Sequence, residues 1–407
     1  MTRAAGDMHV GINLLWLAPG VVGGSEDYTL GLLHELADRG SPVPVTLFVN
    51  RSFAAVHTDL CARLHTVVAP VSGRSKAVRV LADNTWLAWA LRRQRITVVH
   101  HMGGLVPFVD AGLGRDGARV LTVHDLQPLE LPHNFSLVKR WFERVAVPWS
   151  VGRADVVSTL NDHVARSVRA RFAIPDNQCA VVPPGARRPG ESTPAPEPEL
   201  PDATGVLDRL GLTGVQYLLY PAITYPHKNH ITAIRAVAGL RQSHPEVRLV
   251  LTGGTGGAEE TVAAVIAASG CADRIVRPGR VTSAELVALY RGATALVFPS
   301  RFEGFGLPVL EAMRLGCPVV VSSTTAVADL AGDAGLAVDP DDVAGWSAAM
   351  ARVCDDDGLR RTMAATGVER AAGYTWDRSV DALQSAWQLA QAIAGGQRGT
   401  TTTGVTS

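Results

Sequence analysis

Short apolar runs that alternate with helical segments constrain the fold of this chain more than any other feature. The segment "HVGINLLWL" (9–17) is almost continuously apolar, as expected for a strand buried on both faces. A glycine turn follows it, and then the helix-like segment "EDYTLGLLHELADRG" (26–40). This alternation predicts a parallel, doubly wound α/β sheet. Further strand-like runs lie at 43–49, 97–102, 119–125, 154–160 and 179–184.

A proline-rich segment divides the chain into two such regions. Its residues, "RRPGESTPAPEPELPDA" at 187–203, cannot build a packed core. Strand-like runs resume after it, and 407 residues are too many for one ordinary core. The predicted organisation is an N-terminal βα domain, a linker, a second βα domain, a terminal helix and a disordered tail, over residues 1–186, 187–206, 207–375, 376–394 and 395–407.

Composition excludes several classes of function. Lys+Arg and Asp+Glu both number 38, so no strong field favours nucleic acid. Residues 1–186 hold 19 basic and 15 acidic residues, a small excess that hints at an anionic or membrane-associated partner. The five cysteines include no C-x-x-C pair, which argues against a disulfide framework or a zinc site. Neither a signal peptide nor a membrane span is evident, so a cytoplasmic location is expected.

The segment "SRFEGFGLPVLEAM" (300–313) places two glutamates around a strand-to-helix turn. A helix is expected from Leu307, and the glycines before it leave backbone N–H groups free to bind an anion. Glu303 lies in the loop and Glu311 one turn into the helix. Each alone has a structural explanation, as a solvated loop charge or a favourable helix charge. Together, at a strand end, they indicate a functional site.

Other strand ends carry further candidates. In "YPAITYPHKNH" (220–230), Lys228 begins a helix, where a bound phosphate would offset its unfavourable interaction with the dipole. A surface lysine is the alternative. His124 ends a strand in "TVHD", and a structural histidine bonded to the backbone is equally consistent with that position. In "GVVGGSEDY" (20–28), Gly24 contacts a ligand or simply forms a tight turn, and Ser25 is the expected helix N-cap.

These motifs resemble the retaining GT-B glycosyltransferases of sequence family 4, also called glycosyl transferases group 1. "PSRFEGFGLPVLEAM" matches that family's E-x7-E signature, with support from "YPHKNH", "TVHD" and "VVPPG". The similarity extends to about residue 385. It implies two Rossmann-like βαβ domains facing across a cleft, with the C-terminal helix packing back on the N-terminal, acceptor-side domain.

The resemblance also implies roles for individual residues. Glu311 would bind the ribose hydroxyls and Glu303 the donor sugar. Gly24 would lie close to the phosphates, and His124 would touch the transferred sugar. No metal or other cofactor is needed. The sugar and diphosphate would contact the amides of Gly304, Phe305, Gly306 and Leu307.

Charge stabilisation is the point at which the chain departs from the family. Lys228 would neutralise the departing diphosphate, but the arginine that usually lies five residues earlier is replaced by Ile223. Arg301 and Arg280 are the candidates for the second cation.

The implied activity is transfer of a mannose-, rhamnose- or glucose-type sugar from a GDP-, UDP- or dTDP-linked donor. The acceptor would be a hydroxyl on a glycan, lipid-linked or small molecule, in bacterial polysaccharide or glycoconjugate biosynthesis. The alternatives are a nucleotide-sugar epimerase or hydrolase and a non-catalytic sugar-nucleotide-binding subunit. Peripheral contact with the inner membrane face is a further expectation. The basic and aromatic segment 138–149 favours an ordinary amphipathic helix over a membrane-surface helix.

Overall fold

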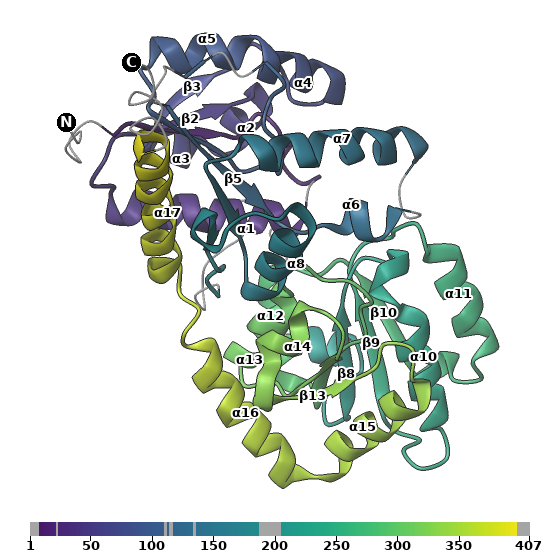
Figure 1. Ribbon diagram of the computed structural model, residues 1–407. Helices are drawn as coiled ribbons and strands as arrows, with labels where there is room; N and C mark the ends of the chain where they lie inside the picture. Colours follow the sequence, from purple (N-terminus) through teal and green to yellow (C-terminus); the bar gives the residue numbers. More distant parts are fainter. Residues whose placement is uncertain are drawn as a thin grey trace, which may run out of the picture. The chain divides into compact units, whose positions relative to one another are not determined.

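The chain folds into two compact units. One comprises Met1–Gly185 together with Thr375–Ser407, and the other comprises Ala186–Tyr374. The computed structural model describes residues 8–21, 23–109, 112–113, 117–132, 136–186 and 205–396 (Figure 1). Almost all of the predicted linker and of the predicted tail lies outside the described residues. The five cysteines are free, as expected from their spacing.

The first unit is built on a seven-stranded parallel sheet with the order β3-β2-β1-β4-β5-β6-β7. The predicted doubly wound arrangement is therefore confirmed. The edge strand β3 was not foreseen from the sequence, because its side chains are half-buried or exposed and give no apolar run. The strands are β1 (Val10–Asn13), β2 (Val45–Val49), β3 (His65–Val68), β4 (Val98–His101), β5 (Ala118–Val123), β6 (Val156–Thr159) and β7 (Cys179–Val181).

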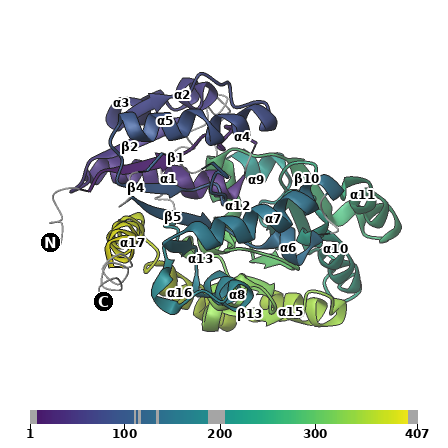
Figure 2. The ribbon, with the colours of Figure 1, turned by 45° about the horizontal axis from the view of Figure 1, so that its top comes forward.

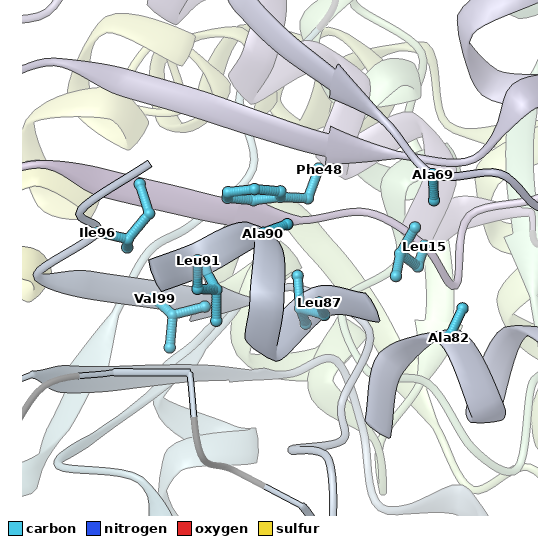
Figure 3. Close-up of a cluster of buried hydrophobic side chains, with 9 residues drawn as sticks. All are labelled: Leu15, Phe48, Ala69, Ala82, Leu87, Ala90, Leu91, Ile96 and Val99. Carbon is cyan, nitrogen blue, oxygen red and sulfur yellow. The ribbon is translucent and has the colours of Figure 1, made fainter. Parts of the chain in front are cut away.

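Helices cover both faces of this sheet, and apolar side chains fill the space between. Figure 3 shows one such cluster, in which Leu87 and Leu91 lie near Phe48 and Val99 of the sheet. The helices before the linker are α1 (Gly24–Arg39), α2 (Arg51–Val56), α3 (Thr58–Arg63), α4 (Lys76–Asn84), α5 (Trp86–Arg93), α6 (Gln127–Glu130), α7 (Leu137–Arg153) and α8 (Asp162–Phe172).

The last helix, α17 (Trp376–Gly396), belongs to the first unit, as Figures 1 and 2 show. It packs on α1 and on β4 to β7. Its fully buried Trp387 donates a hydrogen bond from Nε1 to His100 Nδ1 at 3.2 Å. At its start, Ser379 Oγ donates to the carbonyl of Pro183 at 2.6 Å. The expectation that the C-terminal helix returns to the N-terminal domain agrees with these contacts.

The second unit repeats the architecture with a six-stranded parallel sheet of order β10-β9-β8-β11-β12-β13. Asp342 caps α15 by accepting a hydrogen bond from the Gly345 N–H at 2.9 Å. The elements are α9 (Val206–Arg209), β8 (Tyr217–Pro221), α10 (His230–Gly239), β9 (Arg248–Thr252), α11 (Glu259–Ala268), β10 (Ile275–Gly279), α12 (Ser283–Gly292), β11 (Ala295–Phe298), α13 (Leu307–Arg314), β12 (Val319–Ser322), α14 (Ala326–Ala331), β13 (Gly335–Val338), α15 (Val343–Asp355) and α16 (Asp357–Ala371).

Each sheet has one point at which the strand order reverses. It lies between β1 and β4 in the first unit and between β8 and β11 in the second. Chain crossovers leave such a point toward opposite faces, so a crevice opens there at the carboxyl ends of the strands. The loops after these four strands are therefore where ligand-binding residues are expected.

Candidate active site

A buried ion pair lies at the reversal point of the second unit. Lys228 ends a short 3-10 turn (Pro226–Lys228) after β8, and Glu303 lies in the loop after the neighbouring strand β11. Lys228 Nζ is 2.7 Å from Glu303 Oε1, and the two side chains are only 20% and 10% exposed. Two residues predicted separately from different motifs are thus brought together.

The surroundings of the pair hold Lys228 in place. The hydroxyl of the buried Tyr220 donates to the Lys228 carbonyl, and the Phe298 ring centroid lies 5.6 Å from Nζ. Burial, helped by the charge of Lys228, lowers the pKa of His227 to about 4, and burial lowers that of His230 to about 4. Both histidines are therefore neutral near pH 7, and the positive charge at this loop is that of the lysine.

The turn into α13 leaves the start of that helix open. Gly306 is the N-cap, has φ of 97° and provides no side-chain cap. A Cβ at Gly306 would lie 2.3 Å from Val327 Cγ1, so both the backbone conformation and the space require glycine. One turn into the helix, Glu311 Oε2 accepts a hydrogen bond from the Tyr290 hydroxyl at 3.2 Å. The four residues of this turn are Gly304, Phe305, Gly306 and Leu307.

The two candidate second cations differ in their contacts. Arg301 is bonded to Asp341, with Nε 2.8 Å from Oδ1. Arg280 follows β10 and is exposed, and its guanidinium lies against Gly254, where its Nε would be 3.0 Å from a Cβ on that glycine. Within the described parts of the chain, no carboxylate pairs with Arg280. Of the two candidates, Arg280 is thus the one without a carboxylate partner among the described residues, and the pairing of Arg301 with Asp341 had no signal in the sequence.

The position of the missing arginine is filled by an apolar contact. Ile223 is half-buried, and its Cγ2 would be 3.0 Å from a Cβ on Gly256. The neighbouring Thr224 hydroxyl donates to Glu259 at 2.8 Å and accepts from the Gly256 N–H at 2.7 Å. Ile223 and Thr224 are thus held by packing and by hydrogen bonds, one of them to the Glu259 carboxylate, and these two residues contribute no positive charge to the site.

A cleft of about 290 Å³ opens at the carboxyl edge of the first unit. His124, which follows β5, lines it, and His124 Nε2 lies 2.8 Å from the carbonyl of Met102. Burial lowers the pKa of His124 to about 4, so the ring is neutral and Nε2 carries the proton that the carbonyl accepts. The alternative interpretation of His124, a structural histidine bonded to the backbone, therefore holds for its Nε2. The residue also lines the cleft. The residues that line this cleft include Trp16, His124, Asp125, Lys139, Glu143 and Val147.

Gly24 is the first residue of α1, and a Cβ there would meet nothing within 4 Å. Its predicted role beside the phosphates stays a prediction. The expected N-cap Ser25 is wrong, because the cap is Gly23, with φ of 76° and no side-chain hydrogen bond. The Glu26 carboxylate instead orders the loop by accepting from the Gly20 N–H at 2.9 and 3.0 Å.

Within the described ranges, no three His, Cys, Asp or Glu side chains gather in a way that suits a metal ion. Over the same ranges, no helix is both long and apolar enough to cross a bilayer.

Two family models match the chain in adjoining regions. "Glycosyltransferase Family 4" matches residues 22–187, and "Glycosyl transferases group 1" matches residues 210–370, so that the two cover most of the sequence. The chain belongs to the group 1 glycosyltransferases. The family resemblance inferred from the E-x7-E motif is confirmed, and so is the assignment of this glycosyltransferase as an enzyme of the GT-B class.

Individual relatives agree with this assignment. The glycosyltransferase is 28% identical over 313 residues to O-antigen chain mannosyltransferase B of Escherichia coli, which covers 74% of this chain and 77% of the relative. It is 28% identical over 397 residues to D-inositol 3-phosphate glycosyltransferase of Corynebacterium diphtheriae, with 90% of each chain covered. Among solved structures, Anabaena HepE in complex with UDP-glucose superposes with a TM-score of 0.68 at 17% identity, covering 95% of this chain and all of HepE.

Proposed function

We propose that this glycosyltransferase moves a hexosyl group from a nucleoside diphosphate sugar to a hydroxyl acceptor, with retention of the anomeric configuration. The Lys228–Glu303 pair beside the uncapped start of α13 is the observation that carries the proposal. A helix N-terminus and an ammonium group both attract a diphosphate. In the proposal, the Glu303 carboxylate accepts hydrogen bonds from the hydroxyls of the donor sugar.

The chemical step follows from this arrangement. The bond between the anomeric carbon and the diphosphate oxygen breaks, and Lys228 and Arg280 stabilise the negative charge that develops on the leaving group. The acceptor oxygen forms its bond to the anomeric carbon on the same face. Its proton passes to the departing phosphate oxygen, so no separate general base is required. Because two cations and the backbone amides provide the charge stabilisation, the reaction requires no metal ion.

Glu311 completes the donor site at its nucleoside end. Its carboxylate accepts a hydrogen bond from the Tyr290 hydroxyl at 3.2 Å, and in the proposal it also accepts hydrogen bonds from a ribose diol. We propose a mannose-type sugar as the first donor to test, supported by the O-antigen mannosyltransferase relative, and GDP as the first carrier to try with it. UDP-glucose is the second, supported by the ligand of HepE. The acceptor is assigned to the first-unit cleft, in biosynthesis of a bacterial surface glycan.

The decisive experiment measures donor binding and product formation separately. Calorimetry with GDP, UDP and dTDP identifies the nucleotide, and NMR of the product with the matching donor reports its anomeric configuration. Product is expected with retained configuration and undiminished rate in EDTA. An inverted product, or a requirement for divalent metal, contradicts the proposed mechanism. Consumption of donor without any acceptor would indicate an epimerase or hydrolase, and binding without turnover a non-catalytic subunit.

The proposal includes contact with an anionic membrane through α7. Leu137, Trp141 and Val145 recur every four residues along this helix and are 71%, 72% and 55% exposed, so they form an apolar stripe on its outer side. Basic residues flank the stripe: the Arg153 guanidinium lies 5.1 Å from the Trp149 ring centroid, and Arg144 is exposed. An apolar stripe with tryptophan and flanking cations is typical of helices that lie in the headgroup region of anionic bilayers.

Vesicle sedimentation tests this contact. The protein is expected to sediment with phosphatidylglycerol-containing vesicles and to stay in solution with pure phosphatidylcholine. Trp141→Ser should weaken the binding severalfold, because it removes the most exposed aromatic ring of the stripe. Trp89→Ser is the matched control, since Trp89 is 55% exposed but lies on α5. Equal loss of binding in both variants, or binding independent of lipid charge, refutes the assignment to α7.

A further inference from the structure

We infer that Asn229 is a positioning residue, which holds Lys228 against the loop of Glu303 through its buried side-chain amide. The inference rests on the proposed function, in which Lys228 stabilises the diphosphate of the donor. Asn229 follows Lys228 directly and is the N-cap residue of α10. In this inference Asn229 acts through its neighbour and is assigned no contact with the donor itself.

The backbone at Asn229 has an unusual conformation. Its φ of 57° and ψ of 41° lie in the left-handed region. Three non-glycine residues among those described have a positive φ, and Asn229 is the only one of them in the second unit. This conformation ends the 3-10 turn at Lys228 and lets α10 begin at His230. Glycine adopts it at lower cost than any other residue, so the backbone alone does not account for an asparagine here.

The side-chain amide of Asn229 does account for it. The residue is buried, and its Nδ2 donates to the Pro299 carbonyl at 3.1 Å and to the Pro340 carbonyl at 2.7 Å. Its Oδ1 accepts from the Thr232 hydroxyl at 3.1 Å. The amide thus bonds through both its nitrogen and its oxygen. A buried polar group bonded in this way keeps its partners in one arrangement, because a lost bond would leave an unsatisfied group away from water.

The two carbonyls belong to loops that follow two other strands of the sheet. Pro299 directly follows β11 and lies four residues before Glu303. Pro340 lies two residues after β13. Asn229 itself lies in the segment between β8 and α10, so its amide joins the loops after three strands. These bonds hold the backbone beside Lys228 close to the loop whose Glu303 carboxylate lies 2.7 Å from Nζ.

A backbone hydrogen bond supports the same arrangement from the other side of Lys228. The Arg301 N–H donates to the His227 carbonyl at 2.8 Å, so the residue before Lys228 is also bonded to the Glu303 loop. A charge that is held in place before the donor binds requires no reorganisation during the reaction. A displacement of about 1 Å in a catalytic group can cost about 10²-fold in rate. Loss of the Asn229 amide should therefore impair the function of Lys228.

The test compares nucleoside diphosphates with their parent nucleosides. Calorimetry measures the binding of UDP, GDP and dTDP beside that of uridine, guanosine and thymidine, and kcat is measured with the donor that the wild type uses. Asn229→Gly permits the same backbone conformation and removes the amide. It should weaken diphosphate binding severalfold and lower kcat by about tenfold or more. The affinity for the nucleoside should stay unaltered, because only the diphosphate meets Lys228.

A double variant shows whether Asn229 acts through Lys228. When it is added to Lys228→Met, Asn229→Gly should have little further effect on diphosphate binding or on kcat, since the two residues act as one unit. Thr232→Val removes the hydroxyl that donates to Asn229 Oδ1 and should show the same selective loss to a smaller degree. This milder variant carries the test if Asn229→Gly does not fold.

Asn50→Gly is the matched control. Asn50 is also buried, and its Nδ2 donates to the carbonyls of Leu15 and Leu17 at 3.2 and 2.8 Å, but it lies in the first unit. Its replacement should leave the binding of the nucleoside diphosphates unaltered, although it also removes a buried and fully bonded amide.

The outcomes separate this inference from the proposed function. Equal losses of affinity for diphosphate and nucleoside, full additivity with Lys228→Met, or wild-type behaviour of Asn229→Gly and Thr232→Val overturns the inference alone. Wild-type diphosphate binding and turnover in Lys228→Met would instead contradict the proposed function, and the inference with it.

Discussion

Replacing Lys228 with methionine separates the structural and chemical roles of the Lys228–Glu303 pair. The substitution removes the ammonium group and retains an unbranched apolar stem. It leaves the Glu303 carboxylate, 10% exposed, without the partner that now lies at 2.7 Å. Breaking a buried ion pair from one side destabilises a protein by about 3–5 kcal/mol. Because both side chains keep some access to water, we expect about 2–4 kcal/mol here.

The same variant is expected to lose catalysis by a different amount. Removing one preorganised group that stabilises developing charge lowers kcat by about 10²–10³. Glu303→Gln should destabilise the fold less than Lys228→Met, since a lysine with a long stem reaches water more readily than a short carboxylate. In the double variant no buried charge remains, so the stability should recover most of the loss while the activity stays low.

Chemical denaturation and steady-state kinetics on the four proteins form the assay. The free energies of unfolding should be non-additive by at least about 1 kcal/mol, as contacting residues are. Arg241→Met, on the surface of the same unit, is the control for loss of one positive charge. Single variants that unfold within about 0.5 kcal/mol of the wild type would refute the ion-pair argument. Wild-type turnover in Lys228→Met would refute the proposed role in catalysis.

Three further predictions concern the fold around the sites. Gly306→Ala should destabilise the second unit by about 2–4 kcal/mol in denaturant titrations, because the position has a positive φ and a Cβ there would clash with Val327. Adding Val327→Ala should recover the part of this free energy that the clash costs. Burial raises the pKa of Asp83 from 3.8 to about 6, so the folded protein holds the carboxyl proton more tightly than the unfolded chain does. The stability gained from this bound proton is complete below pH 3.8 and is lost as the pH rises through 6. Asp83→Asn should therefore stabilise the protein by about 3 kcal/mol at pH 8 and by almost nothing at pH 3.5, and an equal effect at both pH values would contradict this. Trp387→Phe should cost about 1–3 kcal/mol in thermal unfolding by leaving His100 Nδ1 without its donor, and an unchanged midpoint would disprove that role.

The sequence predicted those parts of the fold that have a local signal. Strands buried on both faces, such as β1 and β11, produce continuous apolar runs, and Pro308 with the preceding glycines correctly indicated a helix from Leu307. The edge strands β3 and β13 escaped notice, whereas the edge strand β7, whose side chains are also half-buried, was predicted at 179–184. Partial exposure at a sheet edge thus weakens the local signal without always removing it.

The candidate site was predicted residue by residue, whereas its contacts were not. Nothing local links Lys228 to Glu303 or Arg301 to Asp341, since each pair is formed by loops that meet only when the sheet assembles. For the same reason the sequence could not choose between Arg280 and Arg301 as the second cation. Ser25 was mistaken for an N-cap because its side chain suits that role, whereas the turn needs a positive φ that Gly23 supplies.

The return of α17 to the first unit sets the order in which the two units can be completed during synthesis. Residues Ala186–Tyr374 are contiguous, so the whole second unit is synthesised before the first residue of α17 is added. Until then the sheet of β4 to β7 lacks the helix that packs on it, and His100 lacks its partner Trp387. Domains generally fold in the order of their translation. In this protein the unit that starts first finishes last, and a nascent chain that ends at Tyr374 would expose the apolar face that α17 covers.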